Sequence, residues 1–115
     1  MGTEHLLLAL LAEGTGTAAA VLKSSGATHE RVRAAVIRMM GRGVELEPSA
    51  GEPSFTGRAQ DAIEFARREA VRRGEDRVGT EHILLALAED RDGAAVRILQ
   101  QLDADPATIR AALSS

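Results

Sequence analysis

The sequence predicts an all-α fold, and three features support that prediction. Its 115 residues are 44% hydrophobic but only 2% aromatic, which is typical of one domain with an aliphatic core. Its apolar residues recur at helical spacing, and no segment shows the alternation of apolar and polar residues that marks a strand. The third feature is an internal repeat, in which a stretch near the N-terminus recurs in the second half.

The repeat contains a motif that occurs twice. Residues 2–10 read GTEHLLLAL and residues 79–87 read GTEHILLAL, so each residue of the second copy stands 77 positions after its counterpart. The same spacing continues without a gap and matches Gly16 with Gly93, Ala18 with Ala95 and Leu22 with Leu99. We therefore expect one domain made of two copies of a helical unit. Its predicted parts are a first repeat over residues 1–42, a linker over 43–54 and a second repeat over 55–115.

Each copy of the motif predicts the beginning of a helix. Thr3 and Thr80 stand where an N-cap belongs, each followed by a glutamate in the first turn and then by a leucine-rich run. The prolines, serines and glycines of residues 43–54 are typical of a linker. Further helices are predicted over residues 17–24, 28–41, 93–102 and 105–113.

The second copy is preceded by a helix for which the first copy has no counterpart. Small and apolar residues recur along it at helical spacing, and Gly74 is its predicted C-terminal cap. The first repeat therefore lacks its first helix, and we expect about seven helices in all. Without that helix an apolar surface is left on the first copy, and we expect it to be covered by association, either as a homodimer or by exchanged packing. The residues of this surface are Leu6, Leu7, Leu10 and Leu11.

The paired motif resembles a known family. Two GTEH(L/I)LLAL sequences about 77 residues apart, with Phe-Thr-Gly-Arg-Ala at residues 55–59 before the second, are similar to the double repeat of Clp unfoldase N-terminal domains, especially the ClpC type. The resemblance implies an all-α pseudo-twofold bundle that docks protein substrates and adaptors for an AAA+ unfoldase ring. That family's domain has eight helices, so one helix is missing here.

The same resemblance implies where ligands bind. In ClpC-type domains the threonine and glutamate of each motif are associated with recognition of phosphorylated arginine; here these residues are Thr80 and Glu81, and Thr3 and Glu4. The amides and positive dipole end of a helix suit a phosphoryl group, and a carboxylate suits a guanidinium. The alternative is that threonine only caps the helix and glutamate only complements its dipole. Phe55 corresponds to part of an apolar surface that peptides and cyclic-peptide antibiotics occupy, or it is a hydrophobic staple.

Two other features leave alternatives open. His5 and His82 suggest a metal ligand or a general base, but no His-Glu-x-x-His sequence is present, so a packing role is favoured and no metal site is predicted. The arginines and glutamate of residues 67–73 predict a solvated helix face, or else a docking surface for an acidic adaptor. Phe65, in the middle of the predicted helix, is expected in the core.

Composition argues against several other functions. The chain has no cysteine, no Walker A sequence for ATP phosphates and a net charge of −3 with neither Trp nor Tyr, which is unsuited to nucleic acid. Its longest apolar run, residues 6–12, is much shorter than the ~20 residues of a membrane span. We therefore expect a cytoplasmic protein that binds neither nucleic acid nor membrane and needs no cofactor.

The function predicted from the sequence is a non-catalytic recognition domain for substrates or adaptors of a Clp protease system. The alternative is a free-standing protein of the same fold that sequesters ligands or competes for Clp clients. An enzyme that uses the two Glu-His pairs as a metal site is a third, less favoured hypothesis.

Overall fold

The computed structural model describes residues 2–14, 16–41 and 56–114. These residues contain seven helices, joined by turns, and no strand. The predicted all-α fold with about seven helices is confirmed. The predicted linker, residues 43–54, and Phe55 lie outside the described residues. The helices are α1 (Thr3–Glu13), α2 (Thr17–Ser24), α3 (His29–Gly41), α4 (Gly57–Arg72), α5 (Thr80–Glu89), α6 (Ala94–Gln101) and α7 (Pro106–Ser114).

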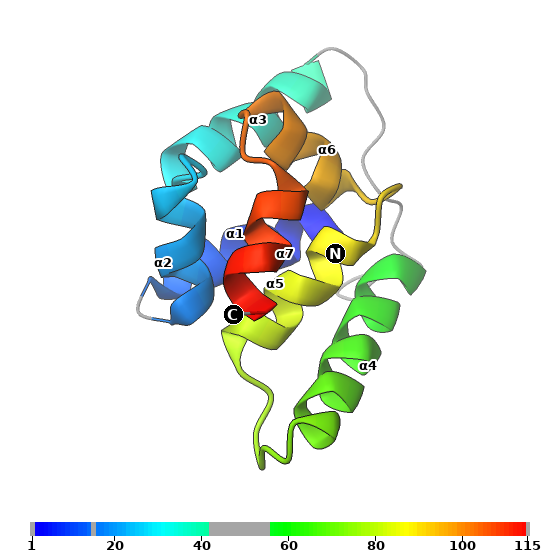
Figure 1. The fold of residues 1–115 in the computed structure, drawn as a ribbon. Helices are drawn as coiled ribbons and strands as arrows, with labels where there is room; N and C mark the ends of the chain where they lie inside the picture. Colours follow the sequence, from blue (N-terminus) through cyan, green and yellow to red (C-terminus); the bar gives the residue numbers. More distant parts are fainter. Residues whose placement is uncertain (1, 15, 42–55, 115) are drawn as a thin grey trace.

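The helices of the two copies pack in a reciprocal way. In the 77-residue repeat, α1, α2 and α3 are the counterparts of α5, α6 and α7. α1 packs against α6 while α5 packs against α2, and α3 packs against α6 while α7 packs against α2. The two copies therefore contact each other through equivalent helices, as a pseudo-twofold bundle requires. α1 and α5 lie in the middle of this bundle (Figure 1).

The core is aliphatic, as the composition predicts. Leu7, Leu22, Leu84, Leu99 and Ile109 are fully buried, and they come from five different helices. Complete burial of such a side chain stabilises a fold by roughly 1.5–3 kcal/mol relative to its exposure. Residues from both copies belong to the same hydrophobic cluster, so the two copies share one core.

α2 and α6 end in the same way at equivalent positions. Gly26 and Asp103 both adopt a left-handed backbone, with φ of 90° and 58°. In each case the following residue donates its N–H to a carbonyl one turn back: Ala27 to Leu22 at 2.8 Å and Ala104 to Leu99 at 2.9 Å. These are Schellman caps, and aspartate is one of the few residues besides glycine that tolerates this backbone.

The predicted apolar patch on the first copy is wrong. All four leucines of that prediction are buried, because α2, α3, α4, α5 and α6 all contact α1. The exposed part of α1 is small: Ala9 and Ala12 are exposed, and Leu8 is half-buried. The predicted homodimer therefore loses most of its support and stays a prediction.

α4 covers one side of α5, and within the described residues no helix covers α1 in the same way (Figure 1). The effect on equivalent residues is clear: Ala86 of α5 is buried, whereas Ala9 of α1 is exposed. The prediction that Phe65 lies in the core is wrong, since 38% of its surface is exposed. α4 packs by a row of buried alanines, Ala59, Ala62, Ala66 and Ala70, and Phe65 lies outside that row.

Within the described residues, no single helix is long and apolar enough to cross a membrane. α1 and α2 meet such a test only as a pair, with a bend of 99° between them. The leucines that give this pair its apolar character are part of the core.

Candidate functional site

The two motifs begin their helices in the same way, but threonine is not the N-cap. Gly2 and Gly79 are the N-caps, and each donates its backbone N–H to the ring of the histidine three residues later. The distance to Nδ1 is 3.2 Å for His5 and 2.8 Å for His82. The prediction that the motif's threonine is the N-cap of its own helix is therefore wrong, because glycine stands at that position and the histidine ring accepts the N–H of this glycine.

Each motif threonine instead caps a helix of the other copy. The N–H of Ala95, in the first turn of α6, donates to Oγ1 of Thr3 at 3.1 Å. The N–H of Ala18, in the first turn of α2, donates to Oγ1 of Thr80 at 3.3 Å. Both capped helices have glycine as their own N-cap, which provides no side-chain acceptor. The threonines thus connect the two halves across the pseudo-twofold axis.

The motif glutamates fold back over the preceding glycines. A Cβ atom on Gly2 would lie 2.6 Å from Oε2 of Glu4, and a Cβ atom on Gly79 would lie 2.6 Å from Cδ of Glu81. Glycine at these positions therefore leaves room for the carboxylate beside the start of the helix. In both copies this places a negative charge against the positive end of the helix dipole.

The two copies differ in the exposure of the predicted ligand-binding residues. Thr3 and Glu4 are fully buried. Thr80 is half-buried, and 30% of the Glu81 side chain is exposed. Ligands in solution can therefore reach the second motif, whereas the first is enclosed by its neighbours. Phe55, predicted to lie on a peptide-binding surface, is outside the described residues.

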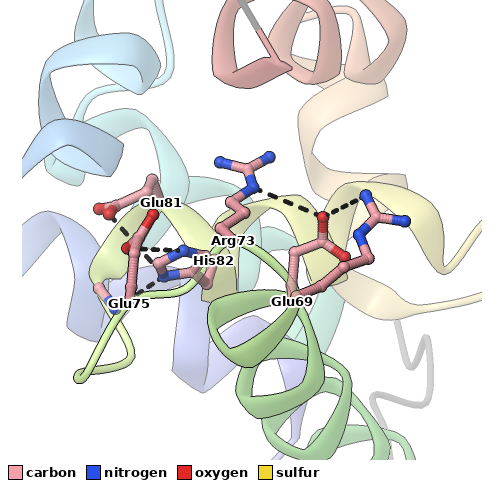
Figure 2. Close-up of polar contacts among 7 residues, drawn as sticks. Glu69, Arg73, Glu75, Glu81 and His82 are labelled. Atoms are coloured by element: carbon pink, nitrogen blue, oxygen red, sulfur yellow. Dashed lines mark hydrogen bonds and ion pairs between the residues drawn. The ribbon is translucent and has the colours of Figure 1, made fainter.

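The histidines of the two motifs lie in different surroundings. His5 is half-exposed, and its Nδ1 lies 3.1 Å from Oε1 of Glu4. His82 is fully buried, with Nε2 only 3.1 Å from Oε2 of Glu75 and Nδ1 at 3.8 Å from Oε1 of Glu81 (Figure 2). Because Nδ1 of His82 accepts a hydrogen bond from Gly79, the proton of the neutral ring is assigned to Nε2, which faces Glu75.

This arrangement bears on the metal-site hypothesis. Within the described residues, a group with the right ligand atoms and spacing for a metal contains Glu75, Glu81 and His82, and it does not include His5. Nδ1 of His82 accepts the N–H of Gly79, and Nε2, the nitrogen to which the proton is assigned, faces Oε2 of Glu75 at 3.1 Å. A metal needs a free lone pair on one of them, so this geometry favours a hydrogen-bonded cluster.

Glu75 is a residue that the sequence did not single out. It lies in the turn between α4 and α5, just before the repeated motif, so no counterpart in the first copy draws attention to it. Its side chain is brought to His82 only by the packing of α4 on α5. A glutamate in a charged turn carries no sequence signal for this contact.

The charged end of α4 is largely paired within the helix. Oε1 of Glu69 lies 2.7 Å from Arg72 and 3.5 Å from Arg73. The contact between Glu69 and Arg73 is drawn as a dashed line in Figure 2. Glu64 has two weaker pairs, at 3.9 Å with Arg67 and 3.8 Å with Arg68. The four arginines are mostly exposed. These contacts agree with the solvated helix face that the sequence favours.

A shallow pocket lies between α4 and α5. Phe65 and Ala86 contribute its apolar wall, and Arg58 of α4 pairs with Asp90 at 2.7 Å beside it. Of the motif's residues only Ala86 lines this pocket, which lies away from Thr80 and Glu81 and includes the partly exposed side chain of Phe65. It is a feature that the sequence did not predict.

Comparisons with known proteins agree with the fold. The family model of the Clp repeat (R) N-terminal domain matches residues 1–102 and again residues 54–115. The chain is 44% identical over 110 residues to the chloroplastic chaperone protein ClpC of Pisum sativum and to chloroplastic ClpC1 of Arabidopsis thaliana. It is equally similar to a chloroplastic ClpA homologue of Brassica napus, an ATP-binding subunit of the ATP-dependent Clp protease.

These matches cover 96% of the chain but only 12% of each relative, so the chain spans a small part of the proteins that it resembles. The duplicated motif, the reciprocal packing of its two copies and a family match over most of the sequence agree with one another. The chain belongs to the Clp repeat N-terminal domain family and is similar to the N-terminal region of ClpC chaperones.

Proposed function

We propose that this domain recognises arginine-phosphorylated proteins, or adaptors that present them, for a Clp unfoldase. The observation that carries the proposal is the accessible start of α5, where Thr80 and Glu81 reach the surface at the N-terminus of a ten-residue helix. Its similarity to ClpC chaperones supports a role in selecting clients. In this proposal the domain works by binding alone, in the cytoplasm, without a cofactor.

The chemistry of this site suits both ends of phosphoarginine. Oγ1 of Thr80 accepts a hydrogen bond from Ala18 through a lone pair, and in this proposal its O–H donates to a phosphoryl oxygen. Amides in the first turn of α5 and the helix dipole add to the attraction for that anion. The carboxylate of Glu81 offers two oxygens to the guanidinium, in the geometry of a charge-assisted bidentate pair.

Thr3 and Glu4 carry the same chemistry in the first copy. Because both are buried, a ligand needs that end of the bundle to open before it reaches them. Binding at the first motif therefore stays a prediction, and the proposal assigns the ligand to the second. The predicted peptide or cyclic-peptide surface around Phe55 likewise stays a prediction.

Calorimetric titration with free phosphoarginine tests this function. We expect saturable binding that plain arginine does not match. Glu81→Gln is expected to weaken it about tenfold or more, as loss of a charge-assisted pair implies. Glu89→Gln, at the exposed far end of α5, is the matched control and should bind like the unaltered protein. Equal heats from arginine and phosphoarginine, or an unaffected Glu81→Gln variant, would reject the proposal.

A further inference from the structure

We propose that Glu75 is a second acceptor for a guanidinium group at the Thr80–Glu81 site and that buried His82 holds it in place. The inference rests on the proposed function and adds to it a residue from outside the repeated motif. It concerns the guanidinium half of the ligand and is independent of how the phosphoryl half is held.

Two carboxylates converge at this position. Ligand atoms of Glu75, Glu81 and His82 all lie within 4.8 Å of one another. Both glutamates turn toward the histidine ring (Figure 2), and their side chains are 42% and 30% exposed. Two negative charges this close repel each other unless a cation lies near them. The pair therefore attracts a cationic group from solution.

The nearby arginines of the domain do not supply that cation. Arg72 and Arg73, at the end of α4, are paired with Glu69, at 2.7 and 3.5 Å. In the described part of the chain, the ion pairs of Glu75 and Glu81 are those with His82. Neither Arg72 nor Arg73 has a recorded ion pair with these two carboxylates.

His82 explains why Glu75 stays beside Glu81. Its ring is fully buried, and Nδ1 is fixed by the N–H of Gly79 at 2.8 Å. Nε2 is also buried and has no partner in good hydrogen-bond geometry among the described residues, although Oε2 of Glu75 is 3.1 Å away. A buried N–H strongly favours an acceptor, so the carboxylate of Glu75 is drawn to the ring.

A guanidinium matches this pair better than a metal ion or an ammonium does. Its planar fork has five N–H donors, so one edge can bind Glu81 with two hydrogen bonds while a remaining N–H reaches Glu75. A metal would need the lone pair that the Nε2 proton occupies. Lysine offers a single compact charge without this planar geometry. The expected ligand is therefore an arginine side chain, phosphorylated or plain.

Binding of two probes, phosphoarginine and N-acetyl-arginine amide, tests the role of Glu75 in the full chain. We expect Glu75→Gln to weaken both by about fivefold to tenfold, since one charge-assisted acceptor is lost. Asp76→Asn removes the same charge from the next residue, which is exposed. The dissociation constants of this variant should stay within about twofold of those of the unaltered protein, because solvent and salt screen exposed charges that do not contact the ligand. Thermal melts of the variants show whether each is folded.

A second readout tests the positioning role of His82. Long-range ¹H–¹⁵N NMR is expected to find its proton on Nε2 in the unaltered protein. A proton on Nδ1, or Zn²⁺ binding that displaces the Nε2 proton, would overturn the inference. Glu75→Gln that binds both probes as the unaltered protein does would also overturn it. That result, with Glu81→Gln still deficient, leaves the proposed function standing.

A different result would reject the phosphoarginine function while keeping the guanidinium acceptor formed by Glu75 and Glu81. If phosphoarginine binds no better than the arginine amide, while both Glu75→Gln and Glu81→Gln weaken amide binding, the phosphoarginine function fails and the two-carboxylate acceptor stands. If neither probe binds the unaltered protein, both are rejected.

Discussion

Thr3→Val should lower the free energy of unfolding by about 1–3 kcal/mol, the cost of leaving a buried backbone N–H without its acceptor. Valine preserves the shape of the side chain but removes the oxygen that accepts from Ala95 at 3.1 Å. α6 then loses this side-chain cap, which its own N-cap, Gly93, cannot provide. Urea denaturation of the two proteins measures the difference.

Two comparisons make this result specific. Thr17→Val changes an exposed threonine in the first turn of α2 and should alter stability by no more than about 0.5 kcal/mol. Thr3→Ser keeps the hydroxyl and should recover most of the loss. If valine and serine at position 3 destabilise equally, the capping hydrogen bond between the copies is not what stabilises this end of α6.

Leu22→Ala and Leu99→Ala should each destabilise the domain by about 2–5 kcal/mol, the range for truncating a buried leucine. The two residues are equivalent in the repeat, and both are fully buried in the same cluster. Because they share one core, we expect similar costs and a single cooperative transition in each variant. Thermal and urea denaturation followed by circular dichroism measure both.

Gln100→Ala is the matched control, since it removes an exposed side chain beside Leu99. Its effect should stay within about 0.5 kcal/mol. The shared core would be contradicted if Leu22→Ala lowered the free energy of unfolding much less than Leu99→Ala does, or if unfolding showed two separate transitions. Either result would show that the first copy is not an equal part of the core.

Helix bounds and caps could be predicted from the sequence, because they depend on residues that are close together in the chain. The helix predicted over residues 17–24 has the same bounds as α2. The helix predicted after Phe55 is α4, which ends near Gly74, a residue with a left-handed backbone. The repeat also indicated that the two halves are built alike. Helical spacing and glycine caps act within a few residues, so these features can be read from the chain directly.

The contacts of the site did not follow from the sequence, because tertiary packing creates them. Thr3 and Ala95 are 92 residues apart, and only the docking of α1 on α6 brings the hydroxyl to its partner. The nearly identical motifs gave no reason to expect Glu4 fully buried and Glu81 partly exposed. That difference arises from the neighbours of each motif, as does the approach of Glu75 to His82.

In the proposed function, phosphoarginine distinguishes two nearly identical helix starts, and a backbone NMR titration with this ligand examines both at once. We predict saturable shifts of the amides of residues 79–82 and of Glu75, while those of residues 2–5 remain in place. Shifts centred on residues 2–5, or none at either helix start, would contradict it.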